Sequence, residues 1–146
     1  LSNPELFVDQ LRHGTRFDPN SRIIVSTANV AFILTRLLLL FGQFNYGKKG
    51  ILDLTHKRLF TFSTLRKLFT QSGFEIEKTY SVPLPWPLVF GDNWFSRILL
   101  WFNRIICIPF SSLFSYQIFM IVRPLPHLDA LYRDAHQQSK SRSKKL

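Results

Sequence analysis

The spacing of apolar and polar residues predicts that helices and strands alternate along most of the chain. A helix is expected over residues 4–14, where Asn3 can cap the amino end and a glycine stands at the carboxyl end. The apolar run 22–26 predicts a short strand buried on both faces, as in a parallel sheet. The apolar segment 30–40 predicts a second helix, and the Gly-rich segment 42–50 predicts an exposed loop.

The second half of the chain continues the same alternation. The pattern predicts a helix over 63–72 with Ser63 as its cap, a strand over 74–82, a helix over 94–108 and a strand over 115–123. This order is typical of a layered α/β domain with helices packed on a central sheet. Three strands are too few for a complete open sheet of this kind, so we expect further strands to precede the chain.

Two of these elements carry exceptions to their patterns. In strand 74–82 the apolar residues share one side with a single polar exception, Lys78. In helix 94–108 two polar pairs, Ser96 with Arg97 and Asn103 with Arg104, recur one heptad apart and share a narrow face. We interpret Trp86, Trp94, Trp101 and the surrounding Phe residues as core packing against the sheet. An apolar acceptor pocket and a membrane-facing patch are the alternatives.

Composition and charge limit the classes of partner. Hydrophobic residues make up 46% of the chain, enough to bury a core, and the net charge of +10 favours an anionic partner. Nucleic acid is not expected, because basic and aromatic residues do not interleave in a recognisable binding motif. We divide the chain into a domain over 1–135 and a basic, disordered tail over 136–146. The single cysteine, Cys107, allows no intrachain disulfide, and no metal site is expected.

Several segments together resemble the back half of class I S-adenosylmethionine-dependent methyltransferases. The stretch 50–75 (GILDLTHKRLFTFSTLRKLFTQSGFE) is similar to the segment that leads into the sixth strand of that fold. Segment 22–29 (RIIVSTAN) resembles the fifth strand with its loop, and 115–123 (SYQIFMIVR) resembles the seventh, which runs antiparallel and inserts beside the fifth. The stretch 44–62 (FNYGKKGILDLTHKRLFTF) is most similar to methyltransferase domains associated with bacterial glycosyltransferases.

The resemblance implies a fold, a cofactor and a missing part. The expected fold is α/β, a partial Rossmann-like methyltransferase fold comprising its C-terminal three strands, two parallel and the last antiparallel, with flanking helices. The cofactor would be S-adenosyl-L-methionine, bound by a Gly-rich turn after the first strand and an acidic residue after the second. This chain has no such Gly-rich turn. We therefore expect no cofactor-binding residue here, and a partner in the missing N-terminal half without which the chain is inactive.

The candidate site residues follow from the position of ligands beyond the carboxyl ends of strands. His56 is the candidate catalytic base, with a structural hydrogen-bonding role as its alternative. Arg58 is expected to bind an anionic acceptor through its bidentate guanidinium, or else to be a surface charge. Asn29, Asn45 and Tyr46 complete the candidate substrate-binding set, the last two in what is otherwise a loop.

Two functions remain open on the sequence alone. The first is methyl transfer to a glycan, a glycolipid or a similar small acceptor, in the cytoplasm or peripheral to the membrane. The second is a basic, non-enzymatic module that binds an anionic membrane surface.

Overall fold

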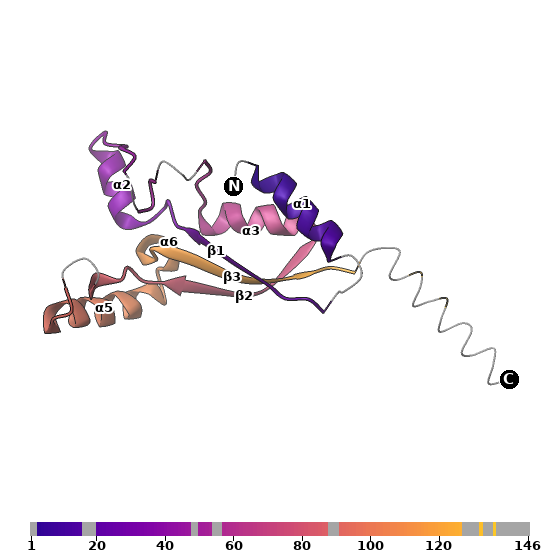
Figure 1. The fold of residues 1–146 in the computed structure, drawn as a ribbon. Helices are drawn as coiled ribbons and strands as arrows, with labels where there is room; N and C mark the ends of the chain where they lie inside the picture. The colour runs from indigo at the N-terminus through magenta and orange to yellow at the C-terminus, as the bar shows by residue number, and fades with distance from the viewer. Residues whose placement is uncertain are drawn as a thin grey trace.

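The structure, a computed structural model, describes residues 3–15, 20–47, 50–53, 57–87 and 91–126 together with 132 and 136. Figure 1 shows the order of its helices and strands: α1 (Pro4–Gly14), β1 (Ile23–Ala28), α2 (Ile33–Leu40), α3 (Phe62–Gln71), β2 (Phe74–Val82), α5 (Trp94–Cys107), α6 (Ser111–Phe114) and β3 (Gln117–Pro124). The predicted α/β class is confirmed. The predicted basic tail lies outside the described residues except for His136.

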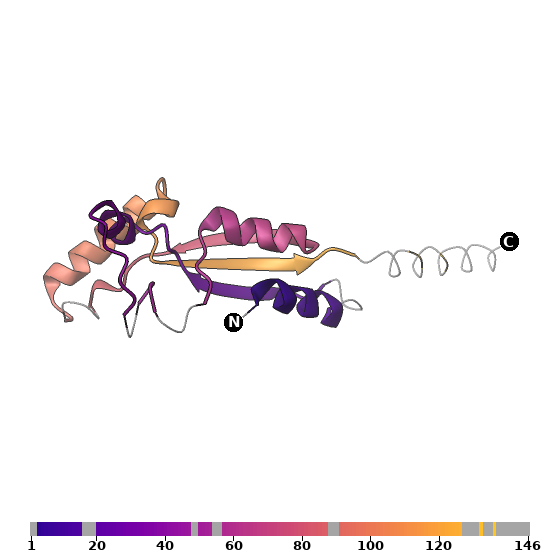
Figure 2. The ribbon, with the colours of Figure 1, turned by 90° about the horizontal axis from the view of Figure 1, so that it is seen from above.

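The three strands form one sheet in the order β1-β3-β2, which Figure 2 shows from above. β1 pairs with β3 antiparallel from Ile23↔Val122 to Ala28↔Gln117, and β2 also pairs with β3 antiparallel. The expectation of two parallel strands is therefore wrong for the hydrogen-bonded pairs. β1 and β2 run in the same direction, but β3 lies between them and separates them.

Only one face of the sheet is covered by helices in the described part of the chain. α1 and α3 both lie above the sheet in Figure 1, and the main core fills the space between them and the strands. The buried members of this core are Val8, Phe60, Leu65, Phe69, Phe74, Ile118, Met120 and Val122. The prediction that β1 is buried on both faces is wrong, because its side chains alternate and Ile24 is 64% exposed on the uncovered face.

Local signals determine where the helices begin and end. Asn3 caps α1 as expected, because its side chain accepts a hydrogen bond from the backbone N–H of Leu6 at 3.0 Å. α3 is capped by Thr61 instead of the predicted Ser63, and Thr61 and Thr64 form a reciprocal capping box. Gly73 ends α3 with φ +79°, a left-handed conformation that favours glycine.

A β-bulge in β2 explains the exceptional position of Lys78. Ile76 pairs with Val122 and Lys78 pairs with Ile121, so Glu77 is an extra residue on β2. The bulge moves every later side chain of β2 to the opposite face. Tyr80, predicted to share the face of Phe74, therefore lies on the uncovered face and is 47% exposed.

α5 buries its polar side and exposes its apolar side, which is the opposite of what core packing requires. Its polar residues Ser96 and Asn103 are buried, whereas Trp94 and Trp101 are 73% and 64% exposed. The interpretation of its aromatic residues as core packing is therefore wrong. Among the described helices, none has both the length and the apolar character needed to cross a membrane.

Candidate functional site

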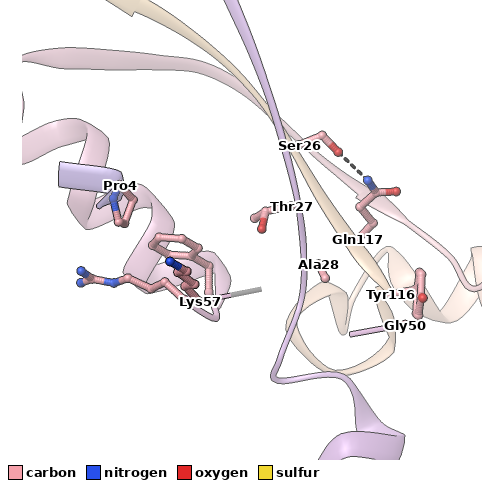
Figure 3. A pocket seen from close by; sticks show the side chains of 10 residues that line it. Pro4, Ser26, Thr27, Ala28, Gly50, Lys57, Tyr116 and Gln117 are labelled. Carbon is pink, nitrogen blue, oxygen red and sulfur yellow. Dashed lines mark hydrogen bonds between the residues drawn. The ribbon is translucent and has the colours of Figure 1, made fainter. Parts of the chain in front are cut away.

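A cavity of about 380 Å³ lies at the carboxyl end of β1, and this volume is typical of small-ligand sites. Figure 3 shows the side chains around it. The lining comes from α1, β1, the segment before α3 and the start of β3: Pro4, Ser26, Thr27, Ala28, Gly50, Lys57, Arg58, Phe60, Tyr116 and Gln117. The cavity therefore combines segments far apart in the sequence.

The strand side of the cavity is polar. The pairing of β1 with β3 brings Gln117 beside the end of β1, where its Nε2 donates a hydrogen bond to Ser26 Oγ at 2.6 Å. Tyr116 is fixed through its backbone, since its N–H donates to the carbonyl of Val82 and its carbonyl accepts from Asn29, both at 2.9 Å. Hydroxyl and amide groups thus line this side, and the Ser26–Gln117 hydrogen bond holds two of them in place, which suits a polar ligand.

Two cationic side chains line the opposite side, and their charges are balanced differently. Arg58 donates to the carboxylate of Glu5 through Nη1, and its guanidinium carbon lies 5.7 Å from the centroid of the Phe60 ring. Among the described residues no carboxylate pairs with Lys57, which Figure 3 places on the other side of β1 from Gln117. Within the described part of the chain, the charge of Lys57 is therefore uncompensated and favours an anionic group.

Gly50 lines the cavity in a backbone conformation that favours glycine. Its φ of +111° is in the region that favours glycine, and a Cβ at this position would lie 4.0 Å from Tyr116 Oη. A substitution of Gly50 would strain the backbone beside the Tyr116 hydroxyl.

Of the residues predicted from the sequence, Arg58 is the one that the described structure places in this cavity. Asn45 instead lines a neighbouring cavity of about 240 Å³, which Tyr116 also lines. Tyr46 is exposed and packs edge-on against Phe44, with ring centroids 5.5 Å apart. His56 lies outside the described residues, directly before Lys57 in the sequence.

Asn29 has a structural role in this chain. It is fully buried, and its Nδ2 donates to the backbone carbonyls of Ser112 and Ser115 at 2.9 and 2.8 Å. Its Oδ1 accepts from the backbone N–H of Ala31 at 3.1 Å. Because these bonds occupy both ends of the amide within the protein, we do not retain Asn29 as a substrate-binding residue.

Sequence reasoning missed most of the polar lining. Ser26 and Thr27 could have been chosen from the sequence, since Ser26 ends a predicted strand and Thr27 begins the loop after it, where ligands usually bind. Tyr116 and Gln117 were not, because their contribution depends on the register between β1 and β3. No three His, Cys, Asp or Glu side chains of the described residues gather in a group that could hold a metal ion.

No family model matches the chain, and no curated protein is significantly similar to it. The fold and the cavity define a mixed α/β protein whose cavity at the end of β1 is lined by polar and cationic side chains.

Proposed function

We propose that the chain is the C-terminal part of a class I S-adenosylmethionine-dependent methyltransferase acting on a glycan, a glycolipid or a similar small acceptor. One observation carries the proposal. The resemblance implies a last strand that is antiparallel and lies beside the fifth, and β3 is antiparallel and pairs with β1, the counterpart of the fifth. This arrangement is the feature expected of a partial Rossmann-like sheet of that family.

The free edge of β1 supports the proposed partner. Among the described residues β1 pairs along its length with β3 alone, so its other edge presents unpaired backbone groups. Such an edge favours the addition of another strand. Ile24, exposed on the uncovered face beside this edge, favours a covering layer as well. We propose that the N-terminal half continues the sheet here and supplies the groups that hold S-adenosyl-L-methionine.

The cavity residues then have separate tasks in acceptor binding. Lys57 attracts a phosphate-bearing acceptor, and Arg58, whose Nη1 donates to Glu5, offers it the other N–H groups of its guanidinium. Thr27, Tyr116 and Gln117 provide hydroxyl and amide groups for the hydroxyls of a sugar. Charge attraction and hydrogen bonding together would fix the orientation of the acceptor, which is the main contribution of protein side chains to an in-line displacement.

Proton removal is the second task. The cofactor supplies a methyl group on a sulfonium, and the acceptor atom that takes this methyl group loses its proton. His56 remains the proposed base, because imidazole is the usual general base of proteins and His56 directly precedes the cavity residue Lys57 in the sequence.

The test is transfer of labelled methyl groups from S-adenosylmethionine by the complete gene product that contains this chain, with free and lipid-linked glycans as acceptors. His56→Ala should lower turnover at least about tenfold, equivalent to about 1.4 kcal/mol of barrier. Arg58→Gln should weaken acceptor binding and raise KM. The matched control Arg66→Gln, on the exposed side of α3, should leave both constants unchanged. Absence of cofactor binding and of transfer to any acceptor would contradict the proposal.

A further inference from the structure

The outward face of α5 is a wide apolar surface. At about 100° per residue, its exposed residues cover roughly half of the helix circumference. The large apolar side chains of this arc are all at least 44% exposed: Trp94, Phe95, Ile98, Trp101, Phe102 and Ile105. An exposed apolar surface of this extent marks an interaction site in a folded domain.

Buried hydrogen bonds hold the helix in this orientation. Asn103 Oδ1 accepts from the backbone N–H of Leu84 at 3.2 Å, and Asn103 Nδ2 donates to the carbonyl of Phe114 at 3.4 Å. Ser96 Oγ donates to the carbonyl of Gly91 at 2.6 Å. Turning α5 to bury its aromatic side would break these bonds and leave buried polar groups unsatisfied. The apolar face is therefore held outward by the same contacts that attach the helix.

The charged side chains within α5 are both arginines. Arg97 and Arg104 fall together on one flank of the exposed arc. The sequence has no Asp or Glu from residue 93 to residue 126. Among the described residues, no carboxylate pairs with Arg104, whereas Arg97 pairs with Asp92 just outside the helix at 3.1 Å. The face therefore combines an apolar centre with a cationic border.

α2 lies at the same end of the sheet as α5 (Figure 1), and it also exposes large apolar side chains. An apolar cavity of about 160 Å³ lies between the two helices and is lined by Leu34 of α2 and Phe102 of α5. Of the 22 large apolar side chains exposed in the described part, eight lie in 34–46 and eight in 94–110. Neither segment contains an acidic residue.

We infer that the outward face of α5 docks on an anionic phospholipid membrane. The helix has 14 residues and measures about 21 Å, whereas the hydrocarbon core is about 30 Å thick. It therefore lies in the plane of the interface, with its aromatic side chains among the acyl chains and its arginines at the phosphates. Tryptophan is favoured at this depth because its ring is apolar and its N–H is polar.

The charges favour a membrane over a second copy of the chain. Two copies joined through this face would bring four arginines into one interface, and α5 has no carboxylate of its own to pair with them. Like charges in a desolvated interface oppose association. An anionic lipid surface complements both the apolar centre and the cationic border of the face.

The test is sedimentation of the full 146-residue chain with phosphatidylcholine vesicles, with and without phosphatidylglycerol. The chain should bind the anionic vesicles and be released by salt. Ile98→Glu should lower the partition coefficient at least about tenfold, because it places a charge among the acyl chains. The matched control is Leu6→Glu on α1, since Leu6 is 55% and Ile98 is 52% exposed. Its binding should match the wild type.

A second pair of variants tests the cationic border. Arg104→Gln should weaken binding to anionic vesicles, and Arg66→Gln on α3 should not. Equal binding of Ile98→Glu and wild type, or no binding of wild type at low salt, would overturn the inference. A dimer in light scattering that Ile98→Glu dissociates would also overturn it, in favour of a second copy. These measurements need no methyl donor, so their outcome is independent of the proposed enzymatic activity.

Discussion

The helices α3 and α5 have similar amphipathic patterns but pack with opposite sides toward the protein. In α3 the apolar residues Leu65 and Phe69 face the sheet and are 3% and 2% exposed. In α5 the polar residues Ser96 and Asn103 face inward, at 0% and 7%. A periodic pattern therefore defines two sides of a helix but does not determine which side is buried.

The surfaces beneath the two helices explain the difference. α3 covers the face of the sheet where Met120 and Val122 point, and the core side chains that it packs against there are apolar. α5 packs against the segment that follows β2 and against the end of α6. There the backbone N–H of Leu84 donates to Asn103, and the carbonyl of Phe114 accepts from it. Because buried backbone groups require hydrogen-bond partners, the polar side of α5 packs inward.

The largest expected contrast is between one phenylalanine of each helix. Phe69→Ala removes a side chain from the main core and should lower the free energy of unfolding by about 3–5 kcal/mol. Phe102→Ala acts on a side chain that is 56% exposed and should cost less than about 1 kcal/mol. Urea unfolding of both variants measures the difference. Similar losses would mean that α5 is packed through its apolar side.

The next contrast concerns the inward polar face of α5. Asn103→Ala leaves the backbone N–H of Leu84 without its partner, which should cost about 1–3 kcal/mol. Its neighbour Arg104 is exposed, so Arg104→Ala should change stability by no more than about 0.5 kcal/mol. Thermal unfolding distinguishes the two. A stabilising effect of Asn103→Ala would contradict the inward orientation.

The smallest effects should be equal in the two helices. Thr61 caps α3 and Asn93 caps α5, each within a capping box. Replacement of either by alanine should cost about 1 kcal/mol, because a cap satisfies end groups of the helix whichever side is buried. Urea unfolding should give similar losses. A loss confined to Thr61→Ala would show that α5 contributes little to cooperative folding.

The elements themselves were largely predictable, because their signals are local. The bounds of α1 and β2 agree with the prediction, since Asn3 and Pro4 start α1 and Gly73 precedes β2. The strand pairing was predicted through the resemblance for β3 beside β1, but not from spacing alone. The bulge at Glu77 was visible as an exception at Lys78, and its effect on Tyr80 required the register.

The candidate site was predicted only in part. Arg58 could be chosen from its residue type and its position after a loop, and it lines the cavity. Asn29 is also a polar residue directly after a predicted strand, yet its amide forms hydrogen bonds to backbone groups of the protein itself. The distinction depends on the carbonyls of Ser112 and Ser115, which lie more than eighty residues away in the sequence. No periodicity of the segment around Asn29 contains that information.

Thiol labelling on both sides of α5 tests most directly whether its polar side is buried and its apolar side docks on a membrane. Cys107 lies on the inward side and is 4% exposed, and burial raises the pKa of its thiol, which the Ser115 hydrogen bond lowers in part. Its thiolate fraction is therefore small at neutral pH, and iodoacetamide should react with it slowly. A cysteine introduced by Ile98→Cys on the outward side should react fast in solution and become protected on phosphatidylglycerol vesicles. Fast labelling of Cys107 in the folded chain, or labelling at Ile98→Cys that vesicles leave unchanged, would contradict the account.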